Sequence, residues 1–274
     1  MNYSFILAVH NQQDVIQECI ERLLFYSSGR FELLVFCDGC TDLTVQICND
    51  LAGVKNDTRL KIYETDNLFE TKVNNLGAQK AKGEYICFLQ GDMLVAEDEW
   101  NERMSKPFKW NDIFAVTTKT AHDWILNEES KDIFKKLKDY QKEQELNWCD
   151  ILSHVNHRDR TNTQRDEFVI KECVNRGPLL MQTSELRYMG GFDSAFAPLD
   201  MDDHDLCYRV IKKTGKKVGL YWVNTYSDES WGATRKGGGK RWHFLSNQKN
   251  VRKVWKRHKD IIMREKKEEV RKLK

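Results

Sequence analysis

Short apolar runs alternate with segments of helical periodicity along the first hundred residues. The apolar runs are short and contain many branched and aromatic side chains, which favours buried strands. The predicted strands are residues 4–9, 31–39, 59–65 and 84–90, and the predicted helices are residues 15–26, 41–52 and 72–83. Strands that alternate with helices at this spacing predict βαβ units, and therefore an α/β fold with a mostly parallel central sheet flanked by helices.

The pattern continues less regularly beyond residue 100. Further strands are predicted at residues 113–120, 174–182 and 217–226, and further helices at residues 128–145 and 202–215 and from a glycine-rich loop to the C-terminus. No repeat or low-complexity linker divides the chain. We therefore expect one domain, in which residues 1–225 form the body with halves 1–100 and 101–225, and residues 226–274 add a basic loop and helix.

Composition describes an ordinary soluble globular protein. The 274 residues are 40% hydrophobic and 31% charged, which excludes a disordered chain. No apolar run approaches the roughly 20 residues needed to span a bilayer. The N-terminus has no basic segment and no small-residue cleavage site, so we expect no signal peptide. With eight cysteines and no export signal, reduced thiols and a cytoplasmic location are expected.

The charge is unevenly distributed. The net charge is +2, but the segment from Arg235 to Lys274 carries sixteen Lys and Arg against four Asp and Glu. Such a tail predicts an anionic partner, which is an anionic membrane surface, a nucleic acid or a charged glycan. A helix that packs on the body and keeps a solvated outer face is the simpler interpretation.

Polar residues follow three of the predicted strands. His10 and Asn11 follow the first strand, Asp38 ends the second, and Gln90, Gly91 and Asp92 end the fourth. Ligands bind at the carboxyl ends of strands in open α/β sheets, so these residues are expected to line one crevice. Asp38 is equally explained as a turn former, because an Asp-Gly pair often begins a turn.

Carboxylates supply the candidate chemistry. Asp92 follows a buried strand and suits a hard divalent cation, Mg²⁺ or Mn²⁺, although it could instead cap the next segment. Five acids lie between Asp193 and Asp205. Asp202 and Asp203 open a predicted helix, where the helix dipole favours their ionised forms. Either could serve as a general base toward an acceptor hydroxyl, or simply cap the helix.

Taken in order, these segments resemble the family 2 glycosyltransferases, which are inverting enzymes with the GT-A nucleotide-diphospho-sugar fold. The similar strings are "SFILAVHNQQDVIQECIERLL", "VFCDGCTDLT", "NNLGAQKAKGEYICFLQGDM", "NRGPLLMQTSELRYMGGFD" and "DDHDLCYR". They occur in the family's order and cover about residues 3–220. The resemblance implies a nucleotide-binding half over residues 1–100 and an acceptor-side half over residues 101–225.

The resemblance implies roles for the residues that bind the donor. Asp38 matches the position that reads the nucleobase, commonly uracil, and Ala8, His10 and Asn11 lie at the end of the first strand. Lys72 is a possible phosphate contact, since Asn74 stands where an Arg is common.

Departures from the family pattern concern the metal and the base. Gln90 and Gly91 replace the first acid of the Asp-x-Asp motif, which leaves Asp92 as the metal residue. His243 is a possible second ligand from a late loop. Asp203 keeps the position of the catalytic base, and Asp202 replaces the usual Glu beside it.

Two further features carry alternatives. Cys37 and Cys40 form a Cys-x-x-Cys pair without the second pair that a zinc site needs, so we interpret both thiols as packing residues. Residues 230–244 contain four glycines and several cations, among them Arg235 and Lys236. They form either a lid that closes on the diphosphate or a solvated loop.

The sequence thus predicts transfer of a sugar from a UDP-sugar to a hydroxyl of a glycan, with inversion, by a metal-assisted single displacement in polysaccharide biosynthesis. Residues 120–172, where the resemblance is thinnest, are expected to set acceptor specificity. A sugar-nucleotide-binding protein with weak catalysis is the alternative. Transfer to nucleic acid is disfavoured, because a basic tail without a nucleic-acid-binding fold gives only non-specific binding.

Overall fold

A computed structural model describes residues 1–127, 148–198, 200–228, 230–231 and 240–273. Its helices are α1 (Ile16–Tyr26), α2 (Thr44–Lys55), α3 (Glu70–Lys80), α4 (Trp100–Ser105), α6 (Trp148–Ile151), α7 (Thr183–Tyr188), α8 (Asp202–Thr214) and α9 (Lys240–Ile262), with 3-10 turns η1 (Lys106–Lys109) and η3 (Ser194–Phe196). Its strands are β1 (Asn2–Val9), β2 (Arg30–Asp38), β3 (Leu60–Thr65), β4 (Tyr85–Gln90), β5 (Leu94–Val95), β6 (Ile113–Thr117), β7 (Ala121–Leu126), β8 (Leu152–Arg158), β9 (Glu167–Lys171), β10 (Cys173–Val174), β11 (Leu179–Gln182), β12 (Lys217–Tyr221), β13 (Thr225–Tyr226) and β14 (Glu269–Lys272).

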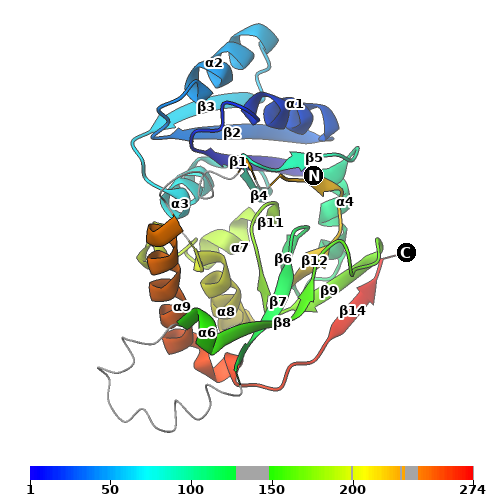
Figure 1. The fold of residues 1–274 in the computed structure, drawn as a ribbon. Coiled ribbons are helices and arrows are strands. Elements are labelled where there is room, and N and C mark those ends of the chain that lie inside the picture. Colours follow the sequence, from blue (N-terminus) through cyan, green and yellow to red (C-terminus); the bar gives the residue numbers. More distant parts are fainter. Residues whose placement is uncertain (128–147, 199, 229, 232–239, 274) are drawn as a thin grey trace.

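The central sheet has nine strands in the order β14-β9-β12-β6-β11-β4-β1-β2-β3. The run from β4 to β3 is parallel, with Val9 opposite Cys37 and Asp38 opposite Thr65. Strand β11 is inserted antiparallel between β4 and β6, so the sheet is mixed beyond the first half (Figure 1). The predicted α/β class is confirmed, and the parallel run brings the ends of β1, β2 and β4 to one edge.

Two hydrophobic cores fill the two faces of this sheet. Alternate residues of β1 point to opposite faces, so Phe5 belongs to the core that includes residues of α1, α2 and α4, whereas Ile6 belongs to the core that includes residues of α3, α7, α8 and α9. Figure 1 shows α1 and α2 on one side of β1 and β2, and α8 and α9 on the far side. Both faces are therefore covered, as the unbroken apolar strands of the first half require.

The middle of the chain differs from the prediction. The predicted strand 174–182 is two short strands, β10 and β11, and the predicted strand 217–226 is also divided, because β13 leaves the main sheet to pair with β5. A small sheet in the order β10-β7-β8 was not predicted. The predicted helix over residues 128–145 lies outside the described residues.

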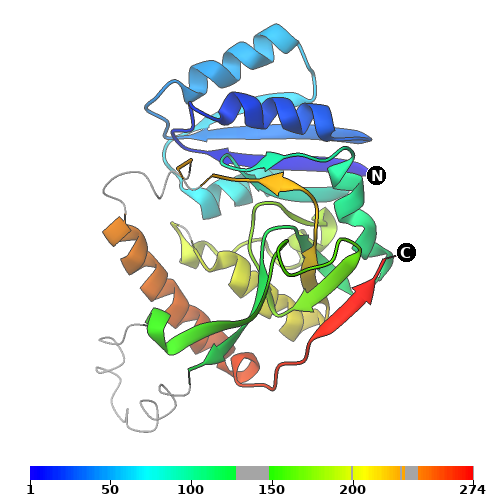
Figure 2. The same cartoon turned by 45° about the vertical axis from the view of Figure 1, so that its right-hand side comes forward.

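The C-terminal helix ends earlier than predicted. Helix α9 ends at Ile262, and the chain then forms β14, which pairs antiparallel with β9 at the outer edge of the main sheet (Figure 2). On its inner side α9 buries Val251, Val254 and Ile261, so packing on the body is observed. The helix cannot continue to the end because β14 supplies the last strand of the sheet.

Helix α8 begins and ends as predicted. Its first residue is Asp202, and Gly215 closes it with a φ of 69° while its N–H bonds to the carbonyl of Ile211 at 3.2 Å. A left-handed residue at this position is the usual helix stop, and glycine adopts it without strain. At the other end of α8, the acidic first turn is bonded to Arg176, which lies between β10 and β11. No helix in the described part of the chain is both long and apolar enough to cross a membrane.

Candidate active site

The ends of β1 and β2 are joined by side chains. The Nδ1–H of His10 donates to the carbonyl oxygen of Asp38 at 2.7 Å. Asn11 has a positive φ of 51°, and its Oδ1 accepts a hydrogen bond from the N–H of Thr41 at 2.8 Å. Ala8, half-buried, lies within β1 just before them. The sequence-predicted donor residues of these two strands therefore lie together.

Asp38 is buried, and both oxygens of its carboxylate accept hydrogen bonds. Its Oδ1 accepts hydrogen bonds from the hydroxyl of Thr65 and the N–H of Leu68, each at 2.7 Å, and its Oδ2 accepts one from the N–H of Phe69 at 2.7 Å. These bonds fix the loop between β3 and α3 against the end of β2. The geometry shows Asp38 shaping the surroundings of the strand end. Lys72 is exposed on the first turns of α3.

At the end of β4 the side-chain amide of Gln90 is hydrogen-bonded, whereas the carboxylate of Asp92 has no partner among the described residues. Gln90 accepts a hydrogen bond from Lys119 Nζ at 3.0 Å and donates one to Glu70 Oε1 at 3.3 Å. Gly91 is buried, and Asp92 is half-buried. No hydrogen bond or ion pair joins the Asp92 carboxylate to another described residue.

The surroundings of Asp92 fit a hard cation. Gln12 is buried beside Gly91, since its Cγ lies 3.4 Å from where a Cβ on Gly91 would stand. The Oε1 of Gln12 has no hydrogen-bond partner in the described part of the chain. An orphaned amide oxygen and an open carboxylate are the ligand types that Mg²⁺ and Mn²⁺ take. His243 falls in the first turn of α9, but its side chain lies outside the described residues.

Arg176 connects the end of β4 to the start of α8. Its guanidinium binds the Asp202 carboxylate in two hydrogen bonds of 2.7 and 2.6 Å, and its Nε lies 3.4 Å from Glu70 Oε1. Its backbone N–H donates to Asp203 Oδ2 at 3.1 Å. Gly177, the next residue, has a φ of 95° and lies so close to Gln90 Oε1 that a Cβ would stand 2.5 Å away. The contacts run without a break from Gln90 through Glu70 and Arg176 to Asp203.

The two acids at the start of α8 differ in access. Asp202 is fully buried, and besides Arg176 it accepts a hydrogen bond from the N–H of Asp203 at 3.0 Å. We therefore assign it a positioning role, although the sequence grouped it with the catalytic residues. Asp203 is 6% exposed. Its Oδ1 accepts hydrogen bonds from the N–H and Nδ1–H of His204 at 2.8 and 2.7 Å.

Burial and neighbouring charges shift the pKa values of Asp203 and Glu70 in opposite directions. Burial disfavours ionisation of Asp203, but His204 and Arg176 outweigh burial and lower the pKa of its carboxyl. For Glu70 burial wins and raises the pKa, although Arg176 opposes it. One guanidinium thus faces three carboxylates, and burial makes that of Glu70 harder to ionise.

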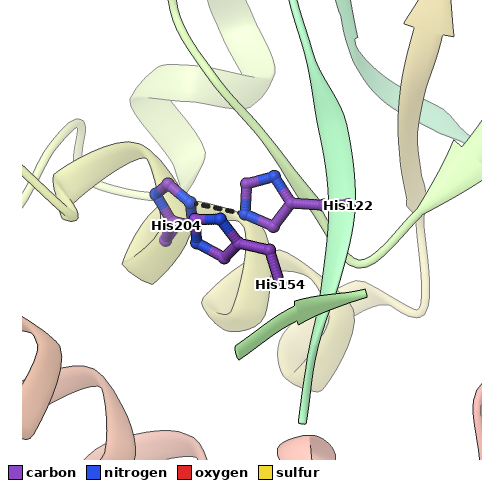
Figure 3. A group of neighbouring side chains, drawn as sticks. All are labelled: His122, His154 and His204. Atoms are coloured by element: carbon purple, nitrogen blue, oxygen red, sulfur yellow. Dashed lines mark hydrogen bonds between the residues drawn. The ribbon is translucent and has the colours of Figure 1, made fainter. Parts of the chain in front are cut away.

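Three histidines lie beside Asp203. The Nε2 of His204 is 3.0 Å from the Nε2 of His122 on β7, and the His154 ring on β8 lies against His122 at a tilt of 30°, with ring centroids 4.0 Å apart (Figure 3). Burial and His204 lower the pKa of His122 well below its ordinary value and that of His154 to about 4. Both rings are therefore neutral at neutral pH.

Several site residues were not predicted from the sequence. Glu70, Arg176, His122 and His204 are all part of the network, and the signal for Arg176 was a lone cation inside an apolar strand pattern. The predicted lid residues Arg235 and Lys236 lie outside the described residues. Cys37 is buried, and Cys40 is half-buried with its thiol 3.6 Å from the carbonyl oxygen of Val9. This arrangement suits packing.

Comparisons with known proteins identify the family of the chain. The model of the family described as glycosyl transferase family 2 matches residues 4–166. An uncharacterised glycosyltransferase of Haemophilus influenzae is 31% identical over 103 residues, which are 37% of this chain and 40% of that protein. The putative glycosyltransferase EpsH of Bacillus subtilis is 30% identical over 95 residues, 35% of this chain and 27% of that protein. The matched segment thus spans less than half of the length of these relatives.

Solved structures show the same fold at low identity. The crystal structure of GalNAc-T7 with UDP, GalNAc and Mn²⁺ superposes with a TM-score of 0.66 at 13% identity, covering 96% of this chain and 49% of that one. The crystal structure of S. aureus TarS with UDP-GlcNAc superposes with a TM-score of 0.56 at 16% identity, covering 87% and 61%. Both likenesses concern the fold.

Proposed function

Because the chain belongs to glycosyl transferase family 2, we propose that it transfers a sugar from a nucleotide-sugar donor to an acceptor hydroxyl. In this proposal the donor is a UDP-sugar, the acceptor is a glycan in polysaccharide biosynthesis, and the transfer inverts the anomeric carbon.

One observation carries the proposal. Side-chain contacts lead from Gln90 at the end of β4, through Glu70 and Arg176, to Asp203 at the start of α8. Donor-side and acceptor-side residues that are more than a hundred positions apart in the sequence therefore belong to one site. A displacement reaction needs this arrangement, since the leaving group and the attacking hydroxyl must be held on opposite sides of one carbon.

The donor side would bind the nucleotide at the ends of β1, β2 and β4. Asp38 holds the loop that follows β3, and His10 and Asn11 hold the ends of β1 and β2 together. Lys72 and Lys119 supply cations toward the diphosphate. Asp92, with the amide oxygen of Gln12, would hold Mn²⁺ or Mg²⁺. Such an ion neutralises charge on a departing diphosphate.

The acceptor side would supply the base. A carboxylate offers about four lone-pair sites, and three of those on Asp203 are occupied by His204 and the N–H of Arg176. The remaining site on Oδ2 can accept the proton of an acceptor hydroxyl as that oxygen attacks. Asp202 and Arg176 hold Asp203 in place, and in this role they are positioning residues.

A second candidate function is a sugar-nucleotide-binding protein with weak catalysis. The observation that favours it is the state of Gln90, whose neutral amide is tied to Lys119 and Glu70 where the family has an acid. Slow hydrolysis of a UDP-sugar that disappears in Asp92→Ala would separate an enzyme from a binding protein.

The donor proposal is tested by thermal shift of the purified chain with UDP and Mn²⁺. We expect UDP to raise the melting temperature, because a ligand that binds only the folded state stabilises it. Asp92→Ala should abolish the Mn²⁺-dependent part of the shift, and Asp38→Ala should weaken the response to UDP. The matched control is Asp98→Ala, an exposed acid on the same segment. Equal shifts in Asp92→Ala and Asp98→Ala would contradict the metal role of Asp92.

Inversion is tested on the product. NMR of a product formed from a donor of known anomeric configuration should show the opposite configuration. Retention would overturn the single displacement with Asp203 as base, and leave the donor assignment intact.

Contact with an anionic membrane is a separate proposal about α9. The outer side of this helix exposes Lys249, Lys256 and Lys259, and cations on an exposed helix face attract anionic lipid. Vesicle co-sedimentation should increase with the fraction of anionic lipid and decrease with salt. Co-sedimentation indifferent to lipid charge would remove this proposal.

A further inference from the structure

The three histidines beside Asp203 come from three separate elements. His122 lies on β7, His154 on β8 and His204 on α8. Each offers one ring nitrogen, and these three nitrogens all lie within 4.8 Å of one another. In Figure 3 the three rings gather at one point between the strand and the helix. Neither the proposed donor site nor the role of Asp203 as base uses His122 or His154.

The hydrogen-bond partners of these rings show which nitrogens carry a hydrogen, and they require a positive charge between His122 and His204. The Nε1–H of Trp124 donates to His122 Nε2 at 2.9 Å, so this nitrogen carries no hydrogen. The Nδ1 of His204 faces the Asp203 carboxylate at 2.7 Å and therefore carries the hydrogen, which leaves Nε2 bare in the neutral ring. Two bare nitrogens 3.0 Å apart repel each other. Either a proton or a metal cation between them makes the contact favourable.

The third ring distinguishes these two occupants. A shared proton needs only His122 and His204, whereas a metal ion would also use His154. Four-coordinate zinc with Zn–N distances of about 2.0–2.1 Å places its ligand nitrogens roughly 3.4 Å apart. The His122–His204 pair is already close to that separation. His154 is exposed, so ions can reach this group of rings from solvent.

The surroundings resemble those of metal-bound histidines in general. A histidine that binds a metal usually donates its other N–H to a carboxylate, which fixes the tautomer and the ring orientation. His204 makes this contact with Asp203. Imidazole ligands select zinc and similar transition metals, whereas carboxylates and carbonyls select Mg²⁺ and Mn²⁺. A cation at the histidines would thus differ in kind from one at Asp92.

We propose that His122, His154 and His204 form a second metal site, which takes Zn²⁺ or a similar transition metal through three imidazoles and leaves one coordination position open. Trp124 gives up its hydrogen bond to His122 when the metal takes the Nε2 lone pair. The ion holds His204 in the tautomer that donates to Asp203. Metal content at this site therefore sets the orientation of the carboxylate at the start of α8.

The experiment is equilibrium dialysis of the chelator-treated full chain against Zn²⁺, with no nucleotide present. The wild-type chain should bind Zn²⁺ at one tight site, and His154→Ala should lower that affinity at least about tenfold, because a lost ligand costs more than a lost supporting hydrogen bond. Excess Mg²⁺ should not displace the zinc. His157→Ala is the matched control, since His157 is exposed, lies on the same strand and bonds to Asp159.

A second measurement identifies the ligands. Co²⁺ in place of Zn²⁺ should give the visible absorption of a tetrahedral imidazole site in the wild-type chain and in His157→Ala, and the bands should be absent in His154→Ala. Zinc bound by cysteine thiols would persist in all three proteins. Equal Zn²⁺ affinity in wild type and His154→Ala, or no binding by wild type, overturns the proposal. Since neither readout needs donor or transfer, its failure leaves the proposed function untouched.

Discussion

At the end of β4 the Asp92 carboxylate is half-buried and bonded to no other described residue, whereas at the start of α8 the Asp203 carboxylate is nearly enclosed and holds three hydrogen bonds. A carboxylate without a partner among the described residues is available to a ligand that comes and goes. A carboxylate held by His204 and Arg176 is fixed before the substrate arrives. We therefore expect Asp92 on the donor side to be held in place only when a ligand binds, whereas the fold itself holds Asp203 on the acceptor side.

The largest expected effect concerns Asp203. Asp203→Asn keeps the shape of the side chain and removes the base, so the turnover of a UDP-sugar with acceptor should fall by about 10²–10⁴. UDP binding by thermal shift should stay unchanged, because the Asp203 carboxylate bonds to Arg176 and His204 and to none of the proposed donor-binding residues. Asp193→Asn, an acid that caps a nearby turn, is the control. If Asp203→Asn retains wild-type turnover, Asp203 is not the base.

Arg176 should matter most for the fold. Arg176→Met leaves the fully buried Asp202 carboxylate without its partner, and breaking a buried ion pair on one side costs about 3–5 kcal/mol. Urea unfolding should show a loss of that size. Arg59→Met removes a partly exposed surface pair with Asp57 and should cost about 1 kcal/mol or less. Comparable losses in the two variants would mean that the acceptor side is not held by Arg176.

The smallest effect concerns Asp112, far from the site. Two hydrogen bonds of 2.7 Å from Arg271 lower the pKa of Asp112 to about 2. A depressed pKa in the folded state means that the pair stabilises the fold above the unfolded pKa of about 4. This contribution is lost as the pH falls from about 4 to 2.

We therefore expect Asp112→Asn to be slightly less stable than wild type at neutral pH, by roughly 1 kcal/mol or less since the pair is exposed. The two proteins should converge as the pH falls toward 2. Urea unfolding at several pH values measures the difference. A constant difference across this range would show that Asp112 acts otherwise than through its charge.

The donor side and the acceptor side also differ in how well the sequence predicts their strands. Strands β1 to β4 were predicted to within about two residues. Strands β1, β2 and β4 are buried on both faces and each reads as one apolar run, whereas β3 is the partly exposed edge strand. Strands β7 and β8 carry His122, Asp123, Ser153 and His154, and β8 pairs with a strand about thirty positions away. Their polar pattern resembles a loop, so the small sheet was missed.

The candidate site divides in the same way. Asp38, Gln90 and Asp92 follow directly from where strands end, which a sequence reveals. Arg176 and Glu70 are joined across more than a hundred residues, and nothing local in "VNRGPLL" or "LFETK" announces that they meet. The C-terminal strand was missed because its cations continue the charge pattern of α9.

The pairing of β14 with β9 has a consequence for handling the protein. Removing the residues after Glu268 would remove the outermost strand of the main sheet and expose the backbone amides and carbonyls of β9. Unpaired strand edges of this kind pair with other chains. Truncated versions that keep every residue of the proposed active site should therefore still aggregate.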